Sequence, residues 1–446
     1  MRKFDKDKYL KNLNFKRNLN KYGKWFYIGL PCLLVLVVGI YFAYSKFTVT
    51  ADSEVVKTTV GDFIYGDIVI GAYVDGVYSS TIPGKTDGYI VKSVSCDNGA
   101  TGTWNDDKWG LTVTNMTKRT KCNIYFETKK LSMAETINNA ASNTSMFATD
   151  DADHNVRYIG ANPSNYVYFN CSDYNNQSDS TCEKWRIIGV FNNVTKSDGT
   201  KENLVKIIRD ESVGNYSWDS SDSSVNSGYG VNDWTDADAM KLLNPGYDSE
   251  SVGGSLYYNA KSGNCYNGSK NATTSCDFTS TGLKNDTTRN AIETVVWNLG
   301  GTASYNSSSN GLASHWYGYE RGTTVYSGRP TTWTGKIGLM YPSDYGYATG
   351  GSSNTSRATC LAKELYNWDS VSDCYNNDYL FNSAYQWTLA PSSGGAGLVF
   401  GVFSGGFVHL LDAYTSDGVR PALYLKSSIS VDSGTGESSN PYRLKF

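Results

Sequence analysis

Apolar and polar side chains alternate along the chain after residue 55, with the period of two residues that is typical of β-strands. Two such runs, 63–74 and 77–82, are separated only by Asp75-Gly76, a pair that accepts the positive φ angles of a tight hairpin turn. Further strands are expected at 89–94, 111–114 and 123–126. The pattern predicts a small all-β module over residues 47–128.

A helix is expected directly after this module. Ser132 is followed three residues later by Glu135, which is the spacing of a capping box at the start of a helix. We expect this helix to end near Asn143, because the residues from there to Asp153 are polar. Residues 129–153 are therefore assigned to a helix and a linker.

A larger domain is expected over residues 154–446. Its apolar runs predict strands at 166–170, 185–191 and 204–208, and helices at 235–243 and 287–299. The second of these helices is predicted from apolar residues that repeat with helical spacing, namely Ile292, Val295, Val296 and Leu299. Trp and Tyr recur in the Ser/Asn/Gly-rich intervals, and because such side chains are usually buried, we interpret the intervals as ordered surface loops.

The C-terminal part of this domain predicts three more strands. Residues 398–411 read as two apolar strands around Ser404-Gly405-Gly406, a turn that glycine permits. Residues 419–425 read as another strand. We expect this last strand to pair with the strand at 185–190, which brings the end of the domain back to its beginning.

The charge distribution at the N-terminus predicts a membrane anchor. Residues 26–44 form 19 consecutive uncharged and mostly apolar residues, a length that spans a bilayer. Residues 1–24 carry a formal charge of +7 and the remainder −10, so a basic cytoplasmic tail precedes an anchor at 25–46, and the C-terminal part faces the exterior. The expected location is the cell membrane, with a single span. A cleaved signal peptide, with Val49-Thr50-Ala51 as its cleavage site, is the alternative.

Eight cysteines lie outside the apolar run, and in sequence order they form four close pairs. Disulfides persist in oxidising compartments, which agrees with an extracellular location. Metal binding is the alternative, but the spacings are not those of zinc sites and the chain has only three histidines. The ninth, Cys32, lies within the apolar run without a partner. The expected pairs are Cys96/Cys122, Cys171/Cys182, Cys265/Cys276 and Cys360/Cys374.

Catalytic and metal-binding motifs are not found in the sequence. Gly-x-Ser-x-Gly, a Walker loop and HExxH do not occur. The residues from Asp151 to Asn155 begin like a calcium loop, but Val156 stands where glycine is needed and Asn162 where glutamate is needed. We therefore expect no cofactor and no metal. The charge flanking the anchor is sufficient to explain the basic tail, so no nucleic-acid partner is expected.

Three segments of the C-terminal third, residues 333–345, 385–391 and 418–425, carry a family resemblance. Further matching pieces are residues 157–163, 185–189 and 440–444. Their order resembles a family of uncharacterised membrane-anchored surface proteins of low-GC Gram-positive gut bacteria and mollicute relatives. The resemblance implies an α+β fold with long loops for residues 154–446, similar to C-type lectins and formylglycine-generating enzymes.

The resemblance also bears on activity. Formylglycine generation needs two free cysteines that bind copper, whereas each outer cysteine here has a near neighbour to oxidise with, so that chemistry is not expected. The fold displays loops whose aromatic residues can bind ligands. The candidate ligand-binding residues are Trp316, Trp333, Tyr345 and Trp387, with core packing as the alternative. Arg420 is expected to pair with a carboxylate inside the domain.

The sequence therefore favours a cell-surface ligand-binding or adhesion protein. A glycan, a host protein or an envelope component is the expected partner. An extracellular enzyme acting on envelope or host polymers is one alternative, and it would require paired carboxylates in a cleft. A structural envelope protein is the other alternative.

Overall fold

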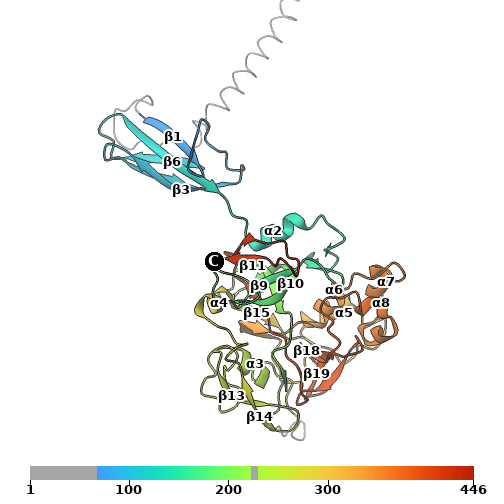
Figure 1. Cartoon of the computed structure of the whole chain (residues 1–446). Coiled ribbons are helices and arrows are strands. Elements are labelled where there is room, and N and C mark those ends of the chain that lie inside the picture. Colours follow the sequence, from blue (N-terminus) through green and yellow to red (C-terminus); the bar gives the residue numbers. More distant parts are fainter. Residues whose placement is uncertain (1–67, 222–229) are drawn as a thin grey trace, which may run out of the picture. The chain divides into compact units, whose positions relative to one another are not determined.

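The computed structural model describes residues 68–221 and 230–446, and it divides the chain into two compact units, residues 1–129 and 130–446 (Figure 1). The predicted anchor, with Cys32, lies outside the described residues. Within the described ranges, no helix is both long enough and apolar enough to cross a membrane. These residues are mostly β-structure, with several sheets, few short helices and four disulfides.

The first unit is built from strands alone in its described part. Its strands are β1 (Ile68–Val74), β2 (Val77–Ser79), β3 (Tyr89–Cys96), β4 (Thr101–Asn105), β5 (Gly110–Thr114) and β6 (Thr120–Thr128). The sheet order is β2-β1-β6-β3, and β4 and β5 form a separate hairpin. Asp75 and Gly76 have φ angles of 48° and 83°, so the predicted Asp-Gly hairpin is confirmed. Leu111 and Val113 of the hairpin pack with Ile124 and Phe126 of the sheet to form the core.

The four disulfides join the cysteines in the predicted pairs. They are Cys96–Cys122, Cys171–Cys182, Cys265–Cys276 and Cys360–Cys374. The first links strands β3 and β6, and the other three lie in the larger unit. The sequence-based pairing is confirmed.

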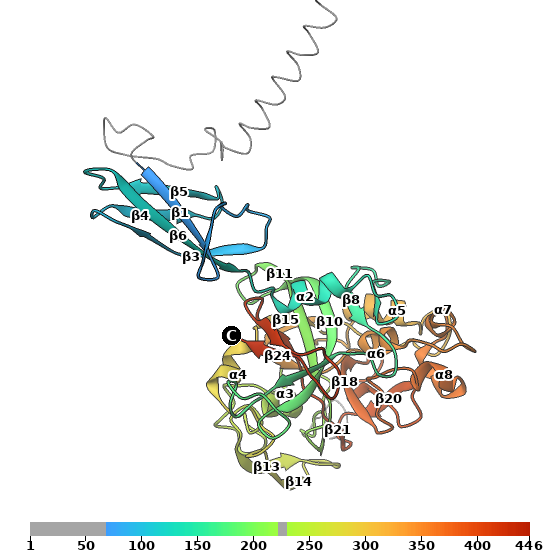
Figure 2. The same ribbon diagram turned by 45° about the horizontal axis from the view of Figure 1, so that its top comes forward.

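The larger unit is organised around a central sheet in the order β17-β22-β11-β10-β8-β7, with β9 also paired to β10. Strands β8, β10 and β11 of this sheet are labelled in Figure 2. The strands of this sheet are β7 (Phe147–Ala148), β8 (Val156–Tyr158), β9 (Tyr166–Phe169), β10 (Glu183–Thr195), β11 (Lys201–Arg209), β17 (Ile337–Gly338) and β22 (Ala422–Leu425). Strands β10 and β11 are almost entirely buried at their centres, so the sheet runs through the core.

A second sheet of five strands has the order β12-β21-β18-β19-β20. Its strands are β12 (Asn215–Tyr216), β18 (Gln386–Pro391), β19 (Leu398–Val402), β20 (Val408–Asp412) and β21 (Asp417–Gly418). The antiparallel pair β19 and β20 confirms the predicted hairpin around Ser404-Gly405-Gly406. Three two-stranded ribbons pair β13 (Ser262–Tyr266) with β14 (Thr273–Asp277), β15 (Val295–Asn298) with β16 (Thr332–Gly335), and β23 (Ser430–Ser433) with β24 (Arg443–Lys445).

The helices of the larger unit are short. They are α2 (Met133–Ala140), α3 (Asp238–Leu243), α4 (Asp286–Ala291), α5 (Ala313–Glu320), α6 (Pro342–Ala348), α7 (Arg357–Leu361), α8 (Ser372–Tyr375) and the 3₁₀-helix η3 (Leu365–Ser370). The predicted capping box is confirmed, because Ser132 and Glu135 exchange both hydrogen bonds at the start of α2. Helix α3 lies within the helix predicted at 235–243.

Two predictions about secondary structure and strand pairing are wrong in the larger unit. The helix predicted at 287–299 ends at Ala291, and residues 295–298 form strand β15 instead, where β-branched Val295 and Val296 suit a strand better than a helix. The strand predicted at 419–425 is present as β22, but it pairs with β11 and not with β10. Strand β11 lies between the two, so closure of the chain occurs one strand further along the sheet.

The beginning and the end of the larger unit lie side by side. Ser132 bridges Ser430, and Val167 of β9 bridges Tyr442. Both views show α2 and β24 on the same side of the unit, with the β13–β14 ribbon on the opposite side (Figures 1 and 2). The terminal strands therefore close the domain at one end.

Candidate functional site

A cavity of about 210 Å³ lies over one face of the central sheet in the larger unit. Its walls combine aromatic rings, amides and one ion pair. The residues that line it are Asp153, Asn155, Phe191, Asn192, Asn193, Val194, Thr195, Val296, Trp297, Asn298, Tyr317, Arg321, Tyr341 and Tyr424. Six separate parts of the chain contribute to the lining. They are the segment before β8, strands β10, β15 and β22, helix α5 with the residue that follows it, and the residue that precedes α6.

Strand β10 is irregular where it borders this cavity. Its register with β11 shifts between Phe191 and Val194, and Asn193 adopts a φ angle of 55°. Such a bulge changes the direction of the side chains beside it and is frequent next to functional sites. It places Asn192 and Asn193 together on the wall of the cavity.

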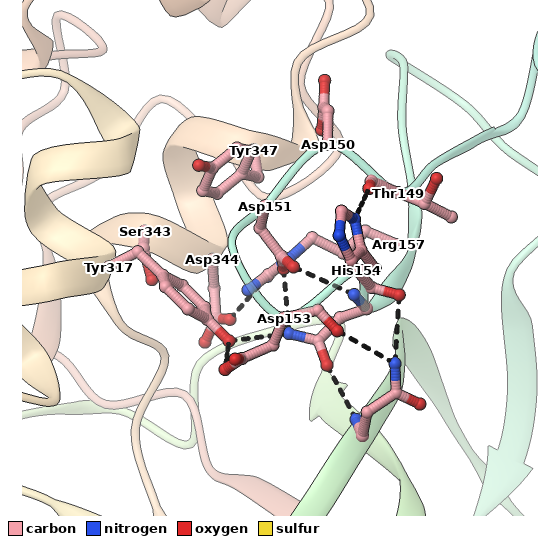
Figure 3. A network of polar contacts seen from close by, with 12 residues as sticks. Thr149, Asp150, Asp151, Asp153, His154, Arg157, Tyr317, Ser343, Asp344 and Tyr347 are labelled. Atoms are coloured by element: carbon pink, nitrogen blue, oxygen red, sulfur yellow. Dashed lines mark hydrogen bonds and ion pairs between the residues drawn. The ribbon is translucent and has the colours of Figure 1, made fainter.

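Tyr317 links the carboxylate and the amide on one wall. Its hydroxyl donates to Oδ2 of Asp153 at 2.6 Å and accepts from Nδ2 of Asn155 at 2.8 Å. Figure 3 shows Asp153 and Tyr317 facing each other in this way. The Asp153 side chain is 54% exposed, so its carboxylate also faces solvent.

Arg321 is fixed on the same wall by three neighbours. Its guanidinium lies 3.3 Å from the ring centroid of Tyr317, Nη1 donates to Oε2 of buried Glu320 at 3.2 Å, and Nε lies 3.8 Å from Asp153. Its Nη2 makes no hydrogen bond to any other residue of the described ranges. The same holds for the side-chain amides of Asn193 and Asn298, so three polar groups on the cavity wall remain able to bind a ligand.

The floor of the cavity covers a buried ammonium group. The Lys206 side chain is 0% exposed, and Nζ contacts Oδ2 of Asp344 at 2.5 Å. Four aromatic rings surround this nitrogen at centroid distances of 4.4 Å for Tyr341, 5.2 Å for Trp297, 5.5 Å for Phe191 and 5.7 Å for Tyr424. Burial lowers the pKa of Lys206, and the charge of Asp344 offsets this effect only in part.

Arg157 connects two buried carboxylates beneath the same site (Figure 3). Its Nε donates to Oδ2 of Asp151 at 2.6 Å, and its Nη1 donates to Oδ1 of Asp344 at 2.9 Å. Burial by itself would raise the pKa of Asp344, but Lys206 and Arg157 outweigh it and hold that pKa at about 2. Asp151, which resembled the start of a calcium loop in the sequence, is thus bonded to a guanidinium.

Glu320 is a third buried carboxyl group near this network. Oε1 accepts from the backbone N–H of Ser343 at 2.8 Å, and Oε2 accepts from the Ser343 hydroxyl at 2.5 Å. Burial raises the pKa of Glu320 to about 7, although Arg321 and Ser343 oppose the shift. Its charge therefore changes near neutral pH, next to a residue that lines the cavity.

None of the four sequence-predicted ligand residues lines the cavity. Trp316, Tyr345 and Trp387 are at most 1% exposed in the core, and Trp333 is half-buried opposite Trp297. The Tyr345 hydroxyl donates to the Gly406 carbonyl, and Nε1 of Trp387 donates to the Tyr216 carbonyl. These placements are those that the core-packing alternative describes.

Arg420 differs from its expected environment. It was expected to pair with a carboxylate, but its hydrogen bonds go to the carbonyls of Arg209 and Leu380 and to the side-chain oxygen of Gln386. Burial lowers its pKa to about 10.

Two signals in the sequence mark the site that the prediction missed. Lys206 is a single charge within the apolar run Leu204 to Ile208, and a charged side chain in a buried strand needs a partner. Asp344 and Tyr317 are direct neighbours of the predicted Tyr345 and Trp316. The right segments were identified, but which of their residues face the cavity depends on the fold.

In comparisons with known proteins, no protein family model, curated protein or solved structure matches this chain.

Proposed function

We propose that this protein is a cell-surface ligand-binding protein whose larger unit binds a small polar group, and a glycan residue in particular, in the cavity between β10, β15 and α5. The observation that carries the proposal is the set of unpaired polar groups on its wall, Nη2 of Arg321 and the amides of Asn193 and Asn298. Amides and a guanidinium beside aromatic rings match the hydroxyl groups and apolar faces of a sugar.

The size of the cavity supports a small ligand. Its volume of about 210 Å³ lies below the roughly 300–1,000 Å³ of pockets that hold drug-sized molecules. One sugar ring at the end of a glycan chain fits this space better than a long polymer segment. Asp153 is the one carboxylate among the described residues that line it, which favours binding over hydrolysis by paired carboxylates at this cavity.

The location and the fold form part of the same proposal. Four disulfides are consistent with an oxidising, extracellular environment. The charge step across residues 25–46 supports a single membrane anchor with a cytoplasmic N-terminus. The pairing of the two ends of the larger unit, at Ser132 with Ser430, supports the lectin-like fold and the surface-protein family inferred from the sequence.

A glycan array, followed by titration of any sugar that binds, tests the proposal with the full chain in detergent. We expect Asn298→Ala to weaken binding about tenfold, the effect of losing one or two hydrogen bonds. Lys184→Met is the matched control, because Lys184 pairs with exposed Asp179 away from the cavity and should leave the affinity unchanged. Failure of every glycan to bind, or equal affinity of Asn298→Ala and the parent chain, would contradict the proposal.

A further inference from the structure

Lys206 and Asp344 form a buried ion pair with a short contact between nitrogen and oxygen. Nζ of Lys206 in β11 lies 2.5 Å from Oδ2 of Asp344 in α6, although 138 residues separate them. Hydrogen bonds from nitrogen to oxygen are commonly about 2.7–3.2 Å long. Because Cγ of Asp344 is bonded to Oδ2, the distance from Nζ to Cγ exceeds the 2.5 Å between Nζ and Oδ2 by at most the length of one C–O bond.

Water is excluded from this pair. Both side chains are 0% exposed, and four aromatic rings, those of Phe191, Trp297, Tyr341 and Tyr424, surround the nitrogen. Burial lowers the pKa of Lys206 and so favours the neutral amine, whereas Lys206 and Arg157 hold the pKa of Asp344 low, so Oδ2 gains its proton only during the reaction itself. The exclusion of water also protects an amide product from hydrolysis.

We propose that Lys206 and Asp344 form an intramolecular amide cross-link, with the loss of one water molecule. The ammonium group transfers one proton to Oδ2, and the neutral amine attacks Cγ. The bond between Cγ and Oδ2 then breaks, and Oδ2 leaves as water with a second proton from the same nitrogen. One hydrogen stays on the amide nitrogen, Oδ1 becomes the amide oxygen, and no oxidant or co-reactant is needed.

Neighbouring groups support each part of this step. Nη1 of Arg157 donates to Oδ1 at 2.9 Å, where negative charge develops during attack on the carbonyl carbon. Glu320 is bonded to Ser343, the residue before Asp344, and can carry a proton because burial raises its pKa to about 7. Arg157 thus contacts the reacting carboxyl group directly, and Glu320 is bonded to the residue beside it.

The same chain contains a matched internal control. Nζ of Lys196 lies 2.5 Å from Oε1 of Glu202, the same separation as in the buried pair. These side chains are 16% and 34% exposed, so water solvates both charges. Short distance alone therefore predicts a cross-link at both places, whereas exclusion of water predicts it only at Lys206.

A cross-link at this position would join the central sheet to helix α6 beneath the cavity. It would fix Asp344 with respect to β11, and it would remove Oδ2, the atom that accepts from the backbone N–H of Tyr341, a residue that lines the cavity. This inference does not depend on the proposed function, because the bond concerns the folded chain with or without a ligand.

Mass spectrometry on the full chain after complete reduction of its disulfides tests the proposal. We expect the parent chain to lack the mass of one water relative to Lys206→Met, after correction for the substitution. Proteolytic digestion should yield a branched peptide that joins Lys206 to Asp344. Lys196→Met should retain the loss of water, and Lys196 should appear only in unbranched peptides.

A measurement on the parent chain alone also tests the cross-link, in case Lys206→Met does not fold. Chain isolated in denaturant before folding should have the full mass, and the loss of one water should develop during refolding. The proposal is overturned if folded parent chain has the full mass, or if the loss maps to another place, such as cyclisation at Asp75-Gly76.

Discussion

Arg157 donates to Asp344 at 2.9 Å across 187 residues of sequence, and it thereby joins strand β8 to helix α6 in the interior. The same guanidinium donates to Asp151, whose side chain is 0% exposed. Buried charges of this kind are tolerated only while they remain paired. The arrangement holds together the elements beneath the floor of the cavity.

Replacing Arg157 should destabilise the larger unit strongly. Arg157→Met leaves Asp151 buried without its ionic partner, and removal of one member of a buried pair costs about 3–5 kcal/mol. Urea unfolding of the full chain measures the loss. Lys184→Met breaks an exposed pair and should cost no more than about 1 kcal/mol. An equal loss of unfolding free energy in the two variants would show that the buried pair contributes no more to stability than the exposed pair.

Stability should fall as the pH rises from 4.5 to 7 because of Glu320. The pKa of this group is about 7 in the folded chain against 4.5 for its ordinary value, so the folded state binds the proton more tightly. The favourable contribution is complete below pH 4.5 and is lost as the pH rises through 7, with a size on the order of 3 kcal/mol.

Urea midpoints of the parent chain and of Glu320→Gln, measured between pH 4.5 and 8, isolate this contribution. Glutamine keeps the shape of the side chain and does not titrate, so the variant should lose the slope that Glu320 provides. Parallel pH profiles for the two chains would refute the assignment.

Deletion of residues 419–446 should unfold the larger unit and leave the first unit folded. The deletion removes β22, which lies between β11 and β17 in the central sheet, and buried Leu423 and Leu425 with it. Burial of each such side chain contributes roughly 1.5–3 kcal/mol. Differential scanning calorimetry should lose the transition of the larger unit. Removal of Phe446 alone, which is 46% exposed, is the control and should shift that transition little. A truncated chain that still melts cooperatively within a few degrees of the parent would contradict this prediction.

Removal of the Cys96–Cys122 disulfide should affect the first unit alone. The bond closes a loop of 26 residues between β3 and β6, and loops of this size contribute about 3–4 kcal/mol. Cys96→Ala with Cys122→Ala should lower the melting temperature of the first unit. The matched pair Cys265→Ala with Cys276→Ala should act on the larger unit instead. A lower melting temperature of the larger unit after substitution of Cys96 and Cys122 would show that the two units do not unfold independently.

The sequence by itself determined those features whose causes lie within a few residues. The Asp75-Gly76 turn follows from the φ angles that glycine and aspartate accept, and the capping box follows from the spacing of Ser132 and Glu135. The disulfide pairs were also predictable, because each joins neighbouring cysteines. In each case the partners are close in sequence, so no knowledge of the tertiary fold is required.

Only the tertiary structure decided which residues form the cavity and its buried charges. The helical spacing of Ile292, Val295 and Leu299 suggested a helix, but residues 295–298 form strand β15 and pair with β16 instead. Lys206 and Asp344 meet across 138 residues, and no local pattern specifies that encounter. A charge in an apolar run shows that a partner must exist, because unpaired burial costs too much free energy, whereas the identity of the partner depends on how the strands and helices pack.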